Sequence, residues 1–285
     1  MEISALFIYP IKSLGGIALL ETMVESRGFE HDRRWVLADK NNRFLSQREN
    51  NAMALIDVAL EADGLLITDR KQKLAPILIQ FQPQTTEHQL ITVWDDAVQA
   101  TRVSDAADAW FSSVLGQTTR LFYQPDASIR LVDQNYATET DYTSFSDGYP
   151  ILIASEASLA LLNEQCPEAI EMKRFRPNVV IKNTLPHEED TLSLIEINDV
   201  VLEGVKPCAR CVMTTINPIT AEKTKEPLKT LMSYRKWNNK ILFGENLLVK
   251  QGGIISVGDS INVVSRKATK LWNVACKLGI YWASM

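Results

Sequence analysis

The sequence predicts a protein that is mainly β with a few helices (α+β), built from two β-rich domains. Between residues 51 and 99, short apolar runs alternate with turn signals such as Ala62-Asp63-Gly64, a pattern typical of a barrel or sandwich. Helical patterns are confined to a few short stretches. The 285 residues, 46% of them hydrophobic, are enough for one large or two modest domains with full cores.

The predicted N-terminal domain, residues 1–122, opens with a strand at residues 3–9 that Pro10 ends. A strand through Arg33 and Trp35 is expected to turn at residues 39–42 and to return over residues 43–48. Ser104 is expected to cap an amphipathic helix that runs to residue 115 and ends at Gly116. Further strands are expected at residues 54–60, 65–68, 77–82, 90–94, 97–103 and 120–123.

The predicted C-terminal domain, residues 123–264, begins in a polar loop at residues 126–143. A strand at 151–154 leads into a helix that Ser155 caps and that runs to about residue 165. Pro207 is expected to close a strand at 199–205, because proline cannot donate to a ladder. We expect residues 212–215 to re-enter a sheet. A short helix at 226–235 and closing strands at 243–247 and 255–261 would follow.

The tail, residues 265–285, carries apolar residues such as Leu271, Trp272 and Trp282, which we expect to dock on the body. A contact with a partner or with a membrane surface is the alternative.

Net charge, cysteine number and the length of apolar runs argue against several classes of function and location. The net charge of −5 and pI near 5.4 argue against a nucleic-acid partner, although a local cationic pocket remains compatible with them. Four cysteines form no disulfide framework, which favours a reducing compartment, and we expect a cytoplasmic location. No signal peptide is evident, and no apolar run approaches the 18 residues of a membrane span.

The most informative stretch runs from Lys206 to Pro218 and contains Cys208 and Cys211 around Arg210. A guanidinium beside a thiol favours the thiolate, which binds metals or attacks electrophiles. A closed zinc site needs four ligands, and Cys166, Cys276 and the three histidines stand apart. A thioredoxin-type dithiol should open a helix, which is not expected here. Two buried structural cysteines are the third alternative.

Other motifs supply groups for an anion. Lys12, Ser13 and the Gly15-Gly16 pair after the first strand have the parts of an anion nest, although an ordinary turn would look similar. Of the adjacent Arg33 and Arg34, one must point inward and needs an anion or a bridge to Asp32 or Glu49.

Residues farther along the chain add to this set. Arg176 precedes a proline and is expected to be extended, with Asn178 on the same side. Asp147 stands in an Asp-Gly turn before a strand and a helix.

Taken together, the cysteine stretch and the segments Tyr9-Pro-Ile-Lys-Ser13, Asp32-Arg-Arg-Trp35, Phe175-Arg-Pro-Asn178 and Glu226–Arg235 resemble MOSC-domain proteins. These are molybdenum-cofactor proteins that include the mitochondrial amidoxime-reducing component and its bacterial ferredoxin-fused relatives. The resemblance spans residues 3–264 and implies a MOSC β-barrel packed on a β-rich MOSC N-terminal domain. The four-cysteine ferredoxin pattern of the bacterial relatives is absent after the core.

The resemblance also implies roles for single residues. Cys211 would be the molybdenum ligand, and Asp147 would lie near the metal. Lys12, Ser13 and Arg33 would hold the phosphate of molybdopterin, Arg176 and Asn178 would contact the cofactor, and Arg48 and Arg210 complete the expected binding set.

The implied reaction is reduction of a small N-hydroxylated substrate, such as an amidoxime or hydroxylamine. Electrons would come from a separate protein, ferredoxin-like or a flavin reductase. A cofactor carrier or delivery protein without turnover is the alternative.

Overall fold

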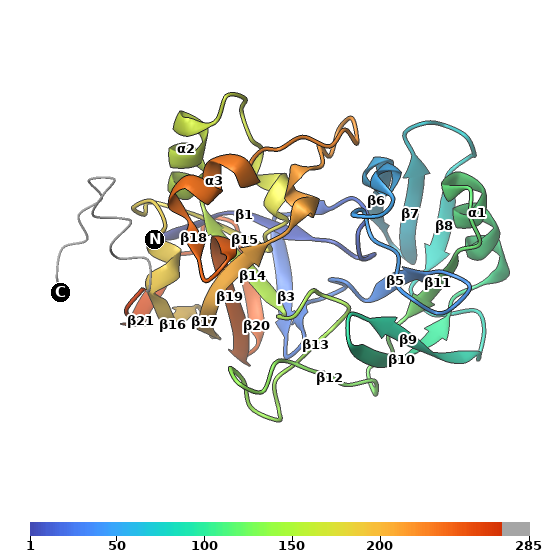
Figure 1. Cartoon of the computed structure of the whole chain (residues 1–285). Coiled ribbons are helices and arrows are strands. Elements are labelled where there is room, and N and C mark those ends of the chain that lie inside the picture. The colour runs from blue at the N-terminus through green and yellow to red at the C-terminus, as the bar shows by residue number, and fades with distance from the viewer. Residues whose placement is uncertain (270–285) are drawn as a thin grey trace.

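The computed structural model describes residues 1–269, so the apolar tail residues from Leu271 onward and Cys276 lie outside the described part. The prediction of a mainly β chain with a few helices is confirmed. The largest sheet has nine strands (Figure 1). Its order is β2 (Ile17–Leu19), β1 (Glu2–Ile8), β15 (Val179–Lys182), β14 (Ile151–Ser155), β19 (Lys240–Gln251), β17 (Val200–Arg210), β16 (Leu192–Ile197) and β21 (Asn262–Arg266), with β18 (Lys236–Trp237) paired to β19.

The first strand of the chain belongs to this sheet, together with strands from the second half of the sequence. β1 pairs antiparallel with β15, with Glu2 opposite Lys182 and Leu6 opposite Val179. A smaller sheet also joins early and late segments in the order β20 (Gly253–Ser256), β3 (Glu21–Glu25) and β4 (Gly28–Phe29). The first 29 residues therefore complete the sheets of the C-terminal half.

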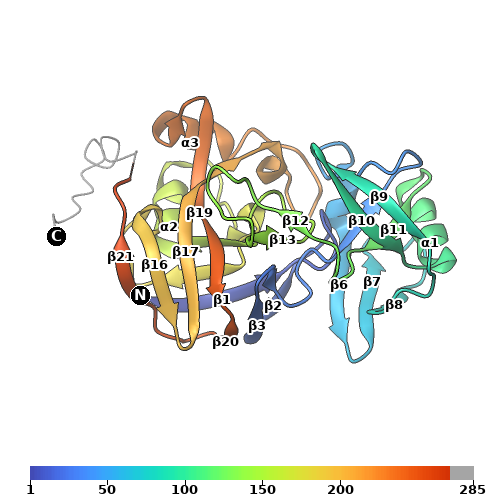
Figure 2. The ribbon, with the colours of Figure 1, turned by 90° about the horizontal axis from the view of Figure 1, so that it is seen from below.

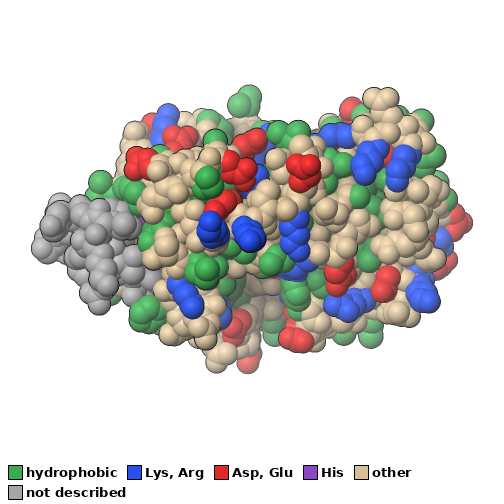
Figure 3. Space-filling view, turned by 45° about the horizontal axis from the view of Figure 1, so that its top comes forward, with side chains coloured by type: hydrophobic (Ala, Val, Ile, Leu, Met, Phe, Trp, Pro, Cys, Tyr) green, Lys and Arg blue, Asp and Glu red, His purple; other side chains and the backbone are tan. Residues whose placement is uncertain are grey.

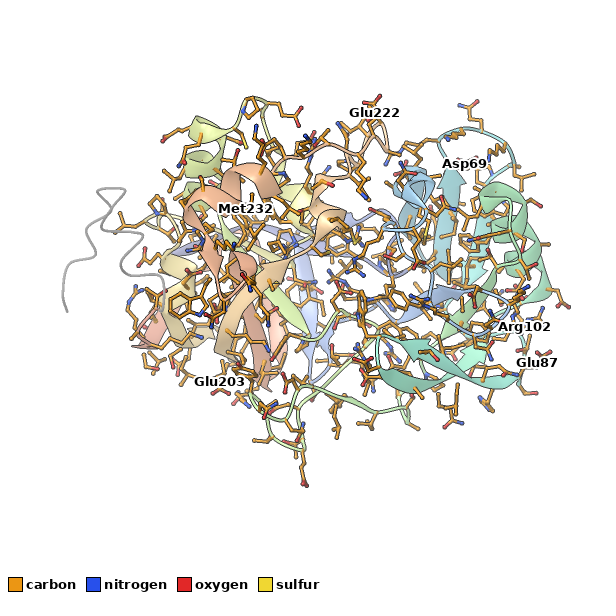
Figure 4. The ribbon with its side chains drawn as sticks, in the orientation of Figure 1. Asp69, Glu87, Arg102, Glu203, Glu222 and Met232 are labelled. Carbon is orange, nitrogen blue, oxygen red and sulfur yellow. The ribbon has the colours of Figure 1, made fainter. Side chains whose placement is uncertain are left out.

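The rest of the N-terminal half forms two further sheets on the other side of the molecule (Figure 2). Their orders are β5 (Trp35–Ala38), β11 (Arg120–Tyr123), β10 (Asp96–Arg102), β9 (His88–Val93) and β6 (Ile56–Glu61), β7 (Gly64–Asp69), β8 (Ile77–Gln80). Helix α1 (Asp105–Leu115) packs here, with Ser104 accepting from the Ala107 N–H and Gly116 left-handed at φ 70°, as predicted. Arg102 and Glu87 meet at the outer end of this half (Figure 4).

The helices of the C-terminal half lie on one side of the nine-stranded sheet (Figure 1). Helix α2 (Glu156–Gln165) begins where Ser155 accepts from the Ser158 N–H at 3.0 Å, as predicted. Helix α3 (Leu228–Tyr234) fills the predicted short helix. The 3₁₀ helices are η1 (Asn51–Leu55), η2 (Met172–Phe175), η3 (Glu188–Thr191) and η4 (Val212–Thr215), and β12 (Arg130–Leu131) pairs with β13 (Tyr142–Thr143) between the halves.

Two expectations near the cysteines are wrong. Strand β17 does not stop at Pro207 but continues to Arg210, because the ladder with β19 shifts register on either side of the proline. A bulge of this kind accommodates a residue that has no N–H to donate. The expected strand at 212–215 is instead η4, in which the Thr214 hydroxyl bonds the Cys211 carbonyl and the Thr215 hydroxyl bonds the Val212 carbonyl. Such local bonds compete with sheet formation.

Two other strand expectations need correction. Residues 43–48 form no return strand: Phe44 makes a single bridge to Ala38, and the chain then turns at Ser46. The Ser46 hydroxyl accepts from the Arg48 N–H at 3.2 Å and stabilises this turn. The strand expected at 54–60 starts at Ile56, because Asn50 caps η1 immediately before it.

Candidate functional site

A pocket of about 740 Å³, including its open part, lies between the two halves and is called the thiol pocket below. Residues far apart in the chain line it. All nine residues that the sequence analysis singled out are among them: Lys12, Ser13, Arg33, Arg48, Asp147, Arg176, Asn178, Arg210 and Cys211.

Both thiols of the cysteine stretch are free and face guanidinium groups. Cys211 stands between the end of β17 and the start of η4, and Arg48 approaches its Sγ with Nε and Nη2, each at 3.3 Å. Cys208 lies within β17, where Arg210 Nη1 is 2.9 Å from its Sγ. Burial raises the pKa of Cys208, and Arg210 only partly opposes this. The two thiols therefore have different cationic partners.

Lys12 is almost fully buried, at 5% exposure, and its ammonium holds the turn that carries Asp147. Nζ donates to the Phe145 carbonyl at 2.7 Å and to Asp147 Oδ1 at 2.6 Å. Burial lowers the pKa of Lys12 to about 8, although Asp147 opposes the change. Enclosure raises the pKa of Asp147, but Lys12 and Arg48 outweigh it and bring that pKa well below its usual range. An ionised carboxylate and a readily deprotonated amine are thus in contact at the pocket wall.

Arg33 and Arg34 point in different directions, as expected, but neither belongs to a strand. Arg33 has a left-handed backbone, at φ 49°, and pairs with buried Asp32, which was one of the alternatives left open. It also donates to Asn178 Oδ1 at 3.0 Å. Arg34 bonds Asp126 at 2.6 Å, outside the thiol pocket.

The expectation of an extended Arg176 is wrong, because it adopts φ 53° and ψ 48° at the end of η2. Its Nη1 donates to the Leu14 carbonyl at 2.7 Å, and its guanidinium lies 4.0 Å from the centre of the Tyr9 ring. Asn178 is 1% exposed and holds backbone: its Oδ1 accepts from the Leu152 N–H, and its Nδ2 donates to the Phe7 carbonyl. The Asn178 amide is therefore occupied by backbone contacts that stiffen the pocket wall.

The pocket carries more positive than negative charge. Its lining includes one carboxylate, Asp147, and six cations: Lys12, Arg33, Arg48, Arg174, Arg176 and Arg210. In residues 1–269, neither Arg176 nor Arg210 has a carboxylate partner, and the buried Nε of Arg210 has no hydrogen-bond acceptor. Unmatched buried charge is costly, so these residues fit an anionic ligand. Figure 3 shows Lys and Arg side chains gathered over the middle of one face.

Sequence reasoning missed three residues of this region. Arg174 lines the pocket and is visible in the sequence only as a neighbour of Arg176. Trp94, at the tip of the β9–β10 hairpin, lies 4.2 Å from the Arg48 guanidinium, a cation–π contact across the fold that no local pattern announces. Arg130 holds the turn before Asp147 through the carbonyls of Ser144 and Ser146.

No group of three or more His, Cys, Asp or Glu side chains in residues 1–269 is arranged to hold a metal ion. Within the same residues, no helix is long and apolar enough to cross a membrane. The cellular compartment stays a prediction.

Two family models match the chain: the MOSC N-terminal beta barrel domain over residues 1–118 and the MOSC domain over residues 140–262. Mitochondrial amidoxime-reducing component 1 of Homo sapiens is 30% identical, over 93% of this chain and 83% of its own length. Mitochondrial amidoxime reducing component 2 of Rattus norvegicus is 29% identical, over 91% and 82%. Molybdenum cofactor sulfurase of Oryza sativa subsp. japonica is 26% identical over 86% of this chain but only 32% of its own length.

Proposed function

The chain belongs to the family of MOSC-domain proteins that includes the mitochondrial amidoxime-reducing components, and from this we propose that it is a molybdenum-cofactor-dependent oxidoreductase that reduces N-hydroxylated compounds. The observation that supports this most is the Cys211 thiol under the Arg48 guanidinium in a pocket with unmatched cations. A soft thiolate is a suitable ligand for a soft metal, and the cations suit the phosphate of its organic part.

In this proposal, Cys211 ligates the metal, and Lys12, Ser13 and Arg33 hold the phosphate. Arg176 and Arg210 donate to the pterin, and Asn178 keeps Arg33 in place through its 3.0 Å contact. When bound, the molybdenum cofactor supplies the two-electron redox change.

The side chains around Cys211 then have separate tasks. Arg48 donates to the Cys211 sulfur through Nε and Nη2 and so orients it in the pocket. Reducing N–OH to N–H consumes two electrons and two protons and releases water. The Lys12 ammonium, whose pKa burial lowers to about 8, can give up a proton at the pocket wall, and the ionised Asp147 Oδ1 at 2.6 Å holds this ammonium in place.

The electrons are proposed to come from a separate protein. The 285 residues contain no ferredoxin-type cysteine set and no G-x-G-x-x-G segment for a nicotinamide or flavin nucleotide. The carrier would be ferredoxin-like or a flavin reductase.

The test compares two thiol variants that differ only in position. Cys211→Ala should bring molybdenum per protein to background and abolish reduction of benzamidoxime with reduced viologen dye. Cys208→Ala should keep the metal and part of the activity. With NADPH alone, the wild-type protein should be inactive. The reverse pattern in the two variants would disprove the ligand assignment, and metal-loaded wild type that is inactive with the dye would favour a cofactor carrier.

A further inference from the structure

A second cavity of about 660 Å³, called the side chamber below, adjoins the thiol pocket. The two share only Arg174, Arg176 and Met213 among their lining residues. Tyr9 lines the side chamber but not the thiol pocket, and the guanidinium of Arg176 lies over its ring at 4.0 Å. Arg176 and Tyr9 therefore form part of the wall between two distinct spaces.

One side of the chamber is apolar and comes from both halves of the protein. Leu14 and Ala54 line it from the N-terminal half, and Ile216 and Pro218 line it from the segment after η4. Leu14, Ala54 and Ile216 are buried, with 0–3% exposure. An apolar wall of this kind is suited to a flat ring.

The chamber also has a cationic side that its own carboxylate does not neutralise. Asp57 is matched by Arg70 through two 2.8 Å contacts, and Arg70 is further occupied by the Pro218 and Ala54 carbonyls. The other cations that line the chamber are Lys173, Arg174 and Arg176, which lie in η2 or at its end.

These three cations have weak partners or no acidic partner. Arg174 is 6% exposed, yet its contacts are long: 3.4 Å to the Glu226 carbonyl and 3.8 Å to Glu168. Charge-assisted hydrogen bonds are normally about 2.7–2.9 Å. Lys173 and Arg176 have no carboxylate within ion-pair distance in the described part of the chain.

We propose that the side chamber binds an organic phosphate with a flat, apolar ring, separately from the ligand of the thiol pocket. The ring lies against the apolar wall, and the phosphate accepts from Lys173 and Arg174. Lys12, Arg33, Arg48 and Arg210 line only the thiol pocket, so a phosphate there has its own donors. The site therefore stands whether or not the thiol pocket holds a molybdenum cofactor.

Isothermal titration of the full chain tests this with phenyl phosphate, inorganic phosphate and phenol. Phenyl phosphate should bind at least about tenfold more tightly than either fragment, because it uses both walls. Lys173→Gln should weaken its binding about fivefold, and Lys173→Glu should weaken it further. Lys173 is exposed, so both variants should fold. Lys236→Gln, at an exposed lysine on β18, is the matched control and should change nothing.

Three outcomes would overturn the proposal. The first is no preference for phenyl phosphate over inorganic phosphate. The second is weaker binding in Arg210→Gln with none lost in Lys173→Gln, which would place the phosphate in the thiol pocket. The third comes from comparing cofactor-loaded with cofactor-free protein: binding to both is expected, whereas loss on loading would show that the cofactor itself fills the chamber.

Discussion

The thiol pocket and a polar cluster beneath helix α2 both enclose several charged side chains, but they differ in how those charges are matched. In the α2 cluster, Asp190 pairs with Arg235 at 2.8 Å, and Glu245 pairs with Lys267 at 2.6 Å. Glu189 accepts from the Ser158 hydroxyl at 2.7 and 2.8 Å. In the thiol pocket, by contrast, Arg176 and Arg210 find only carbonyl or sulfur acceptors among the described residues.

The difference separates structural charge from charge that is available to a ligand. Both members of the Asp190–Arg235 pair are at most 3% exposed, so each compensates the other and leaves nothing for a third group. The cations of the thiol pocket border open space, and their cost falls only when an anion enters. Mutations in the two regions should therefore affect different measurements.

The largest effect is expected from Arg235→Met in the α2 cluster. It leaves Asp190 buried without a partner and should lower the free energy of unfolding by about 3–5 kcal/mol, measured by urea denaturation. Cofactor content in the remaining folded protein should not change. The double variant Asp190→Leu/Arg235→Met should recover much of the loss. If the single variant were as stable as wild type, the Asp190–Arg235 pair would not stabilise the fold.

In the thiol pocket, Arg48→Gln and Arg210→Gln should weaken cofactor retention by about 10–100-fold, since each removes a charge-assisted contact of about 1.5–3 kcal/mol. Molybdenum and pterin content after dialysis measures this. The free energy of unfolding should change by less than about 1 kcal/mol, because neither variant leaves a buried carboxylate unpaired. Arg33→Ala is a poorer test, because Asp32 is 3% exposed and would lose its partner. Large destabilisation in Arg210→Gln would show that Arg210 stabilises the fold and is not held in reserve for a ligand.

Glu189, in the α2 cluster, should make the free energy of unfolding depend on pH. Burial and then Asp190 raise its pKa from 4.5 to about 7. The folded protein binds this proton more tightly than the unfolded chain does, so its contribution to stability is greatest below about pH 4.5. It declines as the pH rises and levels off above about 7. Between pH 5 and pH 8, urea denaturation of wild type should show a loss of about 2–3 kcal/mol from this group, and Glu189→Gln should lack that loss. Parallel curves for the two proteins would refute the assignment.

The smallest effect concerns Lys12. Burial lowers its pKa to about 8, so its ammonium loses a proton as the pH rises through that value. Binding of sulfate, which does not titrate in this range, should weaken several-fold between pH 7 and pH 9 in cofactor-free protein. Lys12→Arg should remove this dependence, because a guanidinium stays charged. An unchanged pH profile in Lys12→Arg would mean that another group controls anion binding.

Sequence reasoning succeeded where the signal was local. The cap of α1 at Ser104 and its end at Gly116 follow from residues in contact with the helix itself. Strands β7–β11 lie within one or two residues of their predicted ranges, because alternation and turn residues define hairpins locally. The nine residues predicted for the site come from separate motifs, and only the fold brings them to one pocket; their roles stay predictions.

The failures share a physical cause, since each depends on contacts that are remote in sequence or on competing hydrogen bonds. Strand β17 continues past Pro207 because its pairing with β19 shifts register on either side of the proline. Arg176 is left-handed rather than extended, with its guanidinium bonded to Leu14, 162 residues away. The threonines after Cys211 favour sheets by composition, yet their hydroxyls close a 3₁₀ turn.

The pairing of β1 with β15 has a consequence for how the chain is made. Glu2 and Lys182 are partners, so 180 residues separate them along the chain (182 − 2). A ribosome adding about 5–20 residues per second needs about 10–35 seconds to deliver the second partner after the first. During that interval β1 has β2 beside it but lacks β15 and the later strands that complete the cover of Ile3, Leu6 and Ile8, each at most 1% exposed in the finished protein. A chain released from the ribosome before residue 182 has been added should therefore depend on chaperones. A chain released after the full sheet has emerged should not.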